Sequence, residues 1–129
     1  MAGYSNTPLP RKLGLKPGLS VALLHAPSDF EQTLHPVPEG VTFRRNPRTP
    51  CDLAIWFVES KRDLAAGLRR ARRVMGAGLW ICWPKKASGR QTDLGEALVR
   101  ETALADGLVD YKICAVDDTW SGLKFAVRR

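Results

Sequence analysis

The 129-residue chain has few cysteines and no C-x-x-C pair; the three are Cys51, Cys82 and Cys114. Their odd number and wide spacing argue against a disulfide framework and against a zinc knuckle. Cys82 and Cys114 stand inside apolar runs, where a thiol behaves as a small hydrophobic side chain. We therefore expect reduced, buried cysteines and no metal site.

Long apolar runs are also missing: no stretch of about 18 residues is free of charge, so a membrane span is not expected. The N-terminal segment lacks the apolar core of a signal peptide, which makes the cytoplasm the expected location. Hydrophobic residues make up 44% of the chain, too many for a disordered one. The length suits a single domain over residues 1–129, with a Pro- and Gly-rich arm at residues 1–16.

Acidic residues are outnumbered, with 13 against 20 basic ones, a formal net charge of +7. This balance suits an acidic partner such as nucleic acid, a phosphorylated ligand or an anionic surface. Most of the excess is arginine, which also accumulates in proteins encoded by GC-rich genomes. A nucleic-acid or protein interaction module is therefore an alternative that we do not favour; its surface would be Arg44, Arg45, Arg48, Arg69, Arg70, Arg72 and Arg73.

Short apolar runs alternate with amphipathic segments. Buried strands are predicted at residues 19–24, 52–58 and 79–83, and more exposed strands at 41–45, 109–116 and 123–127. Helices are predicted over 29–34, from Ser60 to Met75 with Ser60 as N-cap, and over 93–105. This alternation indicates a single-domain, three-layer α/β fold with a mostly parallel sheet that ends in an antiparallel hairpin.

Helix ends are predicted from capping residues and prolines. Ser28 is the expected N-cap of the helix over 29–34, and Pro8 and Pro10 argue against a helix before Arg11. Thr92 or Asp93 is the expected N-cap of the last helix, in a D-x-x-E capping box with Glu96. Its inner face is predicted to hold Ala97, Leu98 and Leu104.

The order of the elements from residue 69 onward resembles the second half of a Rossmann-like methyltransferase. The matching pieces are residues 69–78, 79–83, 93–105 and 109–127. The resemblance implies a Rossmann-like fold but stops at the cofactor loop, because residues 25–30 contain no glycine. Arg44 and Arg45 also stand where an acidic residue would hold a ribose. We therefore expect no cofactor, and a degenerate methyltransferase-like enzyme using S-adenosylmethionine is an alternative only.

The first candidate site is the polar segment 83–93, which follows a predicted central strand. Ligands gather at the carboxyl edge of open α/β sheets, and cations beside a helix N-terminus would attract an anion. The ligand-binding residues would be Lys85, Lys86, Ser88, Gly89, Thr92 and Asp93. The alternative is a solvated basic loop with an ordinary helix cap.

The second candidate site is the segment 116–124, which has more charged, hydroxyl and aromatic side chains than a hairpin turn requires. It would contribute Asp117, Asp118, Thr119, Trp120 and Ser121. Adjacent carboxylates could bind a cation or share a proton, and an exposed Trp120 could stack on a planar ligand. The alternative is that the two aspartates make Asx-turn hydrogen bonds and pair with nearby lysines.

Two further places could contribute to the same site. His25 follows the first buried strand, and histidine is the side-chain type best suited to acid–base work, although a lone histidine is more often a structural hydrogen-bonding residue. Tyr4 and Ser5 belong to the N-terminal arm, which could close a pocket or be disordered.

Three blocks of the sequence together resemble a small bacterial family of unknown function. The blocks are Gly3-Tyr4-Ser5 with Thr7-Pro8-Leu9, Trp83-Pro84-Lys85-Lys86-Ala87-Ser88-Gly89 with Thr92-Asp93-Leu94, and Val116-Asp117-Asp118-Thr119-Trp120-Ser121-Gly122-Leu123-Lys124. The resemblance implies a bacterial, cytoplasmic protein and no particular activity. The blocks coincide with the polar loops chosen above, and packing alone does not select such loops. We predict a non-catalytic module that binds a small anionic ligand, with the oligomeric state left open.

Overall fold

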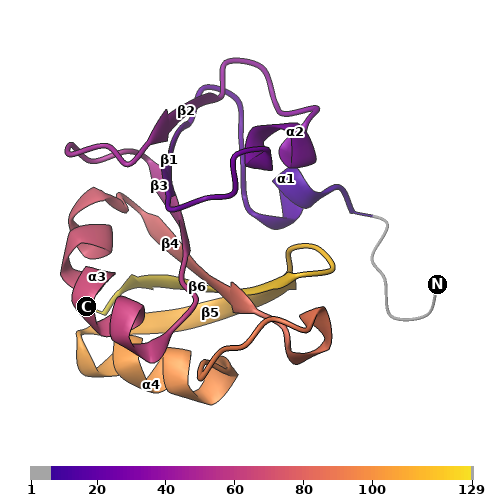
Figure 1. The fold of residues 1–129 in the computed structure, drawn as a ribbon. Coiled ribbons are helices and arrows are strands. Elements are labelled where there is room, and N and C mark those ends of the chain that lie inside the picture. Colours follow the sequence, from indigo (N-terminus) through magenta and orange to yellow (C-terminus); the bar gives the residue numbers. More distant parts are fainter. Residues whose placement is uncertain (1–6, 129) are drawn as a thin grey trace.

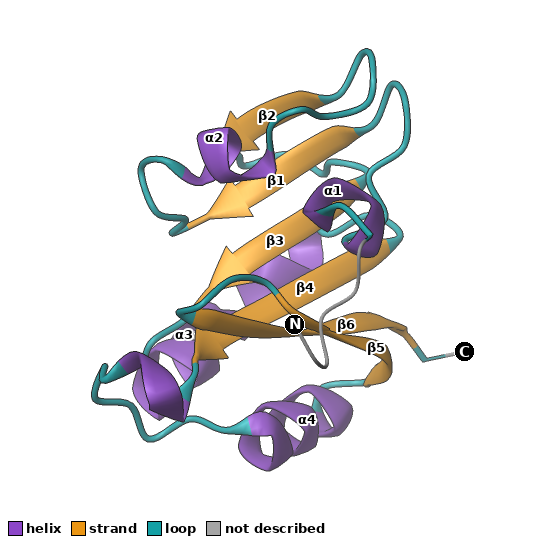
Figure 2. Cartoon of the chain, turned by 90° about the vertical axis from the view of Figure 1, so that its right-hand side faces the viewer, coloured by secondary structure: helices purple, strands orange, loops and turns teal. Residues whose placement is uncertain are grey.

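The computed structural model of the chain describes residues 7–128. In this part, strands β1 (Ser20–Leu24), β2 (Thr42–Arg45), β3 (Leu53–Phe57), β4 (Gly78–Pro84), β5 (Leu108–Ala115) and β6 (Trp120–Val127) form one sheet. The helices are α1 (Leu9–Lys12), α2 (Phe30–Leu34), α3 (Lys61–Val74) and α4 (Glu96–Ala105), which lie on both faces of the sheet (Figures 1 and 2). The predicted three-layer α/β fold is confirmed.

The strand order is β2-β1-β3-β4-β6-β5. β1 pairs in parallel with β2 and with β3, and β3 pairs in parallel with β4. β6 runs antiparallel between β4 and β5, which confirms the C-terminal hairpin. The chain leaves β1 toward β2 on one side and returns to β3 on the other. Ligands in open α/β sheets bind outside the carboxyl ends of strands at such a reversal.

Each face of the sheet has its own apolar core. Buried residues of α3 and α4, such as Leu64 and Val99, pack on one face. Leu13, after α1, and Phe30, in α2, are buried on the other. β3 is buried along its whole length, as expected for a strand covered on both faces. The predicted burial of free cysteines is confirmed.

Helix α3 forms as its sequence predicts. The Ser60 hydroxyl accepts the Asp63 N–H at 3.0 Å and so caps the helix. The predicted apolar stripe is buried against the sheet; its members are Leu64, Leu68, Ala71 and Met75. No helix within residues 7–128 is long and apolar enough to span a bilayer.

Two predicted helix starts near the N-terminus are wrong. α1 begins at Leu9 and includes Pro10, because proline is tolerated in the first turn, where the missing N–H would have no partner. The segment after α1 is not a loose arm, since Leu13 is fully buried. Asp29, not Ser28, is the N-cap residue of α2, and its side chain makes no cap hydrogen bond.

The C-terminal half also differs in detail. α4 begins at Glu96 with Gly95 as N-cap, so the predicted capping box from Asp93 is wrong. The buried residues of α4 are Val99 and Ala103; of the predicted inner face, Leu98 packs against the core and Ala97 is exposed. β6 begins at Trp120, three residues before the predicted start, because the turn before it is short.

Candidate functional site

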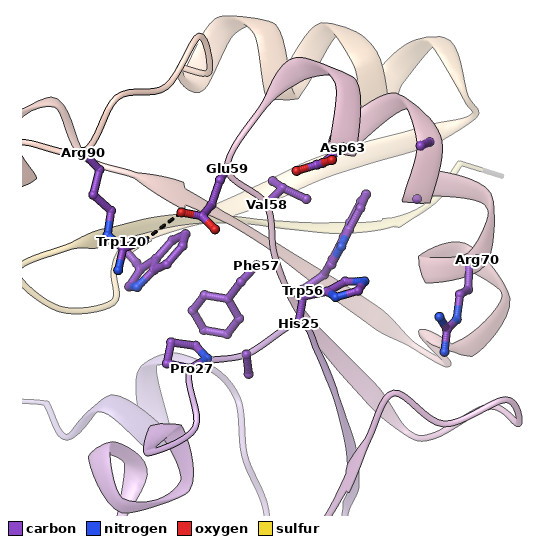
Figure 3. A pocket seen from close by; sticks show the side chains of 13 residues that line it. His25, Pro27, Trp56, Phe57, Val58, Glu59, Asp63, Arg70, Arg90 and Trp120 are labelled. Carbon is purple, nitrogen blue, oxygen red and sulfur yellow. Dashed lines mark hydrogen bonds and ion pairs between the residues drawn. The ribbon is translucent and has the colours of Figure 1, made fainter.

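A pocket of about 740 Å³ lies at the carboxyl ends of β1 and β3, where the strand order reverses (Figure 3). This volume is ordinary for a small-molecule site. The described residues that line it are His25, Ala26, Pro27, Trp56, Phe57, Val58, Glu59, Asp63, Ala66, Gly67, Arg70, Arg90 and Trp120. The loop after β1, the end of β3 and helix α3 therefore supply most of the lining.

Aromatic rings form the apolar walls of the pocket. Trp56 and Phe57 are neighbours on β3 and belong to the cores on opposite faces of the sheet. Trp56 packs so closely on α3 that a Cβ atom at Gly67 would lie 2.6 Å from its Cζ2 atom. The rings of Phe57 and Trp120 meet edge to face, with centroids 5.0 Å apart. Such walls suit the planar or apolar part of a ligand.

Two arginines lie at the pocket. Arg90 donates to the Glu59 carboxylate at 2.7 Å, and its guanidinium lies 5.3 Å from the centroid of Trp120. Arg70, on α3, donates from Nη2 to the carbonyl of Asn46 at 3.1 Å. Within residues 7–128, Arg70 has no carboxylate at ion-pair distance. Its remaining N–H donors are therefore available to an anion in the pocket.

The loop after β1 has an unusual backbone at its first residue. His25 has φ 52°, in the left-handed region that favours glycine. Its N–H donates to Oδ1 of Asn46 at 3.1 Å, and Asn46 has φ 46°. This contact fixes the end of β1 to the residue after β2, and the exposed His25 ring lines the pocket.

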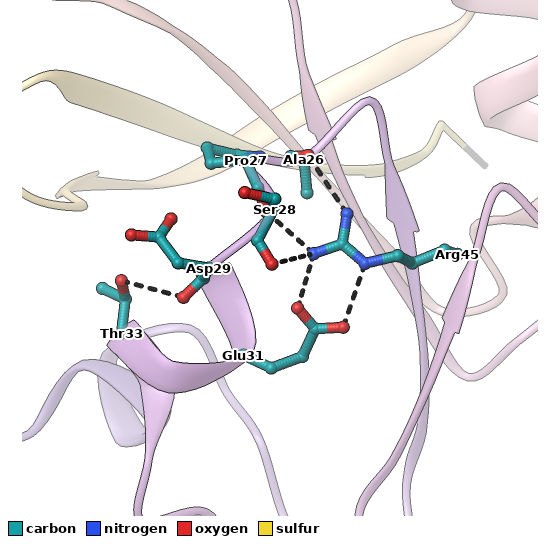
Figure 4. A network of polar contacts seen from close by, with 7 residues as sticks. All are labelled: Ala26, Pro27, Ser28, Asp29, Glu31, Thr33 and Arg45. Carbon is teal, nitrogen blue, oxygen red and sulfur yellow. Dashed lines mark hydrogen bonds and ion pairs between the residues drawn. The ribbon is translucent and has the colours of Figure 1, made fainter.

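Arg45, at the end of β2, forms hydrogen bonds with the same loop after β1 (Figure 4). Its guanidinium donates to the carbonyls of Ala26 and Pro27 at 3.1 and 2.8 Å and to both carboxylate oxygens of Glu31. The hydrogen bond from Arg45 is the main reason that the pKa of Glu31 lies below its ordinary value. The donors of Arg45 are thus used within the protein.

The structure brings the first two predicted segments together. Pro84 faces Trp120 across the β4–β6 pairing, and the Lys85 N–H donates to the carbonyl of Thr119 at 2.7 Å. His25 and Trp120 line the main pocket. Lys86, Thr92 and Asp93 line a second, more open hollow, which shares Glu59 and Arg90 with the pocket.

Several residues of the first segment hold the loop together. The Ser88 hydroxyl donates to the carbonyl of Lys85 at 2.6 Å, and Gly89 ends the short 3₁₀ helix η1 (Lys86–Ser88) with φ 79°. Thr92 donates to the carbonyl of Glu59 at 2.7 Å. Asp93 accepts the Lys61 N–H at 2.7 Å, so it caps α3 and not its own helix. The predicted helix N-terminus at Thr92, with free amides for an anion, is therefore wrong.

The second segment is mainly a turn. Oδ1 of Asp117 accepts the N–H groups of Thr119 and Trp120, both at 2.8 Å, which confirms the Asx-turn alternative for this residue. Asp118 is exposed, and Ser121 is partly buried in β6. Trp120 is 5% exposed, so the prediction of an exposed ring is wrong; its indole packs against Phe57.

Seven described residues of the predicted site line neither hollow: Lys85, Ser88, Gly89, Asp117, Asp118, Thr119 and Ser121. Lys85 lies instead near Cys114. Burial raises the pKa of Cys114, and the charge of Lys85 has a smaller effect that lowers it. Tyr4 and Ser5 lie outside the described residues.

Residues that sequence reasoning missed make up much of the pocket: Trp56, Phe57, Glu59, Asp63 and Arg70. The signal was present, because the carboxyl ends of all parallel strands meet at one edge of a sheet. Applying that rule to the strand ending at Phe57, as well as to the strand ending at Pro84, points to the residues after β3 and the first turns of α3.

No protein-family model and no curated protein matches the sequence. Among solved structures, the chain is similar to the ribosomal protein L11 methylase from Lactobacillus delbrueckii subsp. bulgaricus, with a TM-score of 0.56, 8% identity and coverage of 94% of this chain and 75% of that one. The N-methyltransferase NodS from Bradyrhizobium japonicum WM9 gives a TM-score of 0.54, 12% identity and coverage of 88% of each chain. Magnesium protoporphyrin IX methyltransferase from Synechocystis PCC 6803, with bound SAM, gives a TM-score of 0.51 and 11% identity, with coverage of 94% of this chain and 74% of that one. The chain therefore has a Rossmann-like fold of the methyltransferase type.

The residues around β1 and β2 do not match a nucleoside cofactor. In nucleotide-binding Rossmann folds, glycines after the first strand let the backbone approach the ligand, and an acidic residue roughly 20 positions later holds the ribose. Here the loop has Pro27, which lacks an N–H, and Arg45 stands at the end of β2 with its donors occupied by that loop. The fold is shared with methyltransferases, but this part of the cofactor site is not.

Proposed function

We propose that the chain is a non-catalytic module that binds a small anionic ligand in the pocket at the carboxyl ends of β1 and β3. The observation that carries the proposal is the position of Arg70, a guanidinium without a carboxylate partner in the described chain, at a pocket where the strand order reverses. A phosphate or carboxylate group would bind Arg70, because charge-assisted hydrogen bonds from guanidinium are strong.

The remainder of the ligand is a flat, apolar group. Trp56, Phe57 and Trp120 line the pocket with three aromatic rings, and Arg90, which also lines it, lies 5.3 Å from the centroid of the Trp120 indole. The Glu59 carboxylate accepts a hydrogen bond from Arg90 at 2.7 Å and so helps to hold this wall of the site. Binding without chemistry is the function that these contacts support best.

The experiment is a calorimetric and thermal-shift screen of small phosphates and carboxylates, with aliphatic and aromatic members in pairs. We expect aromatic members to bind more tightly, and Arg70→Ala to weaken binding of the best one at least tenfold. Arg69→Ala is the matched control, since Arg69 is an exposed neighbour on α3 that does not line the pocket. Equal losses in both variants would contradict the proposal.

The alternative of a methyltransferase-like enzyme rests on the fold likeness. Titration of the chain with S-adenosylmethionine separates the two. Because Arg45 is bonded to the loop after β1, we expect no saturable heat of binding with S-adenosylmethionine. Saturable binding of S-adenosylmethionine, together with methyl transfer from it, would favour the enzyme.

A further inference from the structure

Lysines gather on the sheet face that carries α1, at the β5–β6 hairpin. We define the lysine face as Lys12, Lys16, Lys85, Lys112 and Lys124 together with Tyr111. Nζ of Lys124 lies 5.6 Å from the centroid of Tyr111 and 5.8 Å from that of Trp80. Lys112 is paired with Lys124 in the register of β5 and β6. Five of the chain's seven lysines belong to this face.

The positive charges of these lysines affect the pKa values of two neighbouring side chains on the face. The pKa of Lys124 is lowered by burial first, and then by the charges of Lys112 and Lys16. Lys12, Lys112 and Lys85 all lower the pKa of Cys114 against the larger, raising effect of burial. In the described part of the chain, none of the five ammonium groups has an ion-pair partner. The face therefore presents positive charge that the protein does not neutralise.

An exposed aromatic ring lies among the lysines of this face. Tyr111 is 56% exposed and its neighbour Val109 is 39% exposed, both on β5, which is the last strand of the sheet. The β5–β6 register shifts between Asp110 and Lys112, so Tyr111 is an extra residue without a partner on β6. Bulges of this kind redirect a side chain and often lie at sheet edges. Here the bulge places a ring at the surface beside Lys112 and Lys124.

We propose that the lysine face binds single-stranded nucleic acid, with phosphates at the lysines and a base stacked on Tyr111. Lysines along a surface neutralise a phosphate backbone, and aromatic rings among them stack on unpaired bases whatever their sequence. A duplex keeps its bases stacked inside and offers only groove edges to a protein, so it would leave Tyr111 unused. The proposal does not depend on the ligand of the pocket and does not use the arginine-rich surface.

The test is fluorescence anisotropy of the full chain with a labelled 12-nucleotide oligo(dT), measured from about 50 to 200 mM salt. We expect a linear fall of log K with log[salt] and a slope of about −2 to −3.5, since each neutralised phosphate on a single strand contributes about −0.7. A duplex of the same length should bind more weakly at each salt concentration.

Two substitutions separate stacking from charge. Tyr111→Ala should weaken binding about fivefold or more, and Tyr111→Phe should retain it, because stacking needs the ring and not the hydroxyl. Lys112→Ala should reduce the magnitude of the salt slope by about 0.7. Lys61→Ala is the matched control, since Lys61 begins α3, which packs on the opposite face. Thermal unfolding of each variant shows that the fold is kept.

The proposal is overturned by any of three results. The first is no binding at about 50 mM salt. The second is a combination of two observations: Tyr111→Ala leaves oligonucleotide binding unchanged, and anionic phosphatidylserine vesicles bind as tightly as the oligonucleotide. This combination would assign the face to a membrane surface. The third is a stable dimer in sedimentation that Tyr111→Ala dissociates and oligo(dT) does not, which would assign it to a second copy of the chain.

Discussion

The guanidinium of Arg90 lies 5.3 Å from the centroid of the Trp120 ring. Arg90 belongs to the loop after β4 and Trp120 begins β6, so this cation–π contact joins the two polar segments at one wall of the pocket. The ion pair of Arg90 with Glu59 connects the same wall to the end of β3. Three stretches of chain that are distant in sequence thus meet at one site.

Trp120 is predicted to stabilise the fold as well as the pocket. Trp120→Ala should lower the free energy of unfolding by about 3–5 kcal/mol, because the buried indole contacts Phe57 and leaves a cavity when removed. Chemical denaturation measures the change. Trp120→Phe keeps an aromatic ring and should cost clearly less. A loss below about 1 kcal/mol for Trp120→Ala would show that the ring contributes little packing.

Gly67→Ala is predicted to destabilise the protein, although alanine normally stabilises a helix by about 1 kcal/mol relative to glycine. The new Cβ would lie 2.6 Å from Cζ2 of the buried Trp56, so the ring must move. We expect a cost of about 1–3 kcal/mol in urea denaturation. The smaller ring in a Gly67→Ala/Trp56→Phe double variant should make Gly67→Ala less costly than it is in the parent. Stabilisation by Gly67→Ala alone would contradict the close packing.

The ion pair between Arg45 and Glu31 predicts that the free energy of unfolding depends on pH. The pKa of Glu31 is lowered in the folded chain, mainly by the hydrogen bond from Arg45. A lowered pKa means that the stabilisation is present above the ordinary titration range of a glutamate and is lost as the pH falls through the folded value. Because the side chains are 36% and 37% exposed, the contribution is about 1 kcal/mol or less.

Glu31→Gln should remove that part of the acid sensitivity. Urea denaturation at neutral pH and at about pH 3 should show a smaller difference for Glu31→Gln than for the parent chain. Glu39→Gln is the control, since Glu39 is exposed and forms no ion pair among the described residues. Identical pH profiles for the parent and Glu31→Gln would mean that the pair contributes nothing in solution.

Asp93 is predicted to stabilise α3 from outside that helix. It accepts the Lys61 N–H at 2.7 Å, a backbone donor that the helix itself leaves without a partner. Asp93→Ala should therefore cost about 1 kcal/mol, the usual loss on removal of a capping group. Asp118→Ala, at an exposed aspartate, should be neutral. If both substitutions have the same effect on the denaturation midpoint, Asp93 does not act as a cap.

Much of the fold could be predicted because its signals are local. The buried strands are short apolar runs, and α3 shows both its Ser60 cap and its Leu64, Leu68 stripe in the sequence. The start of α4 was not predictable in this way. Asp93 has the spacing of a capping box with Glu96, but its carboxylate is used by Lys61, which is 32 residues away along the chain. Local pattern cannot reveal that competition.

The candidate site was predictable only in part, for the same reason. β6 runs antiparallel to β4, so the residue before β6 lies at the carboxyl end of β4, and the meeting of Lys85 with Thr119 follows from topology. The burial of Trp120 depends on Phe57, and the exposed end of Arg70 depends on the contact with Asn46. These contacts join segments whose distances are set by packing and leave no mark in the sequence.

The most direct test of the pocket is a chemical-shift titration of the ¹⁵N-labelled chain with an aromatic phosphate such as phenyl phosphate. We predict saturable shifts of the indole N–H signals of Trp56 and Trp120 and of the backbone around His25, which Arg70→Ala abolishes and Arg69→Ala retains. Shifts confined to other surfaces, or no saturation with the parent chain while it stays folded, would contradict it.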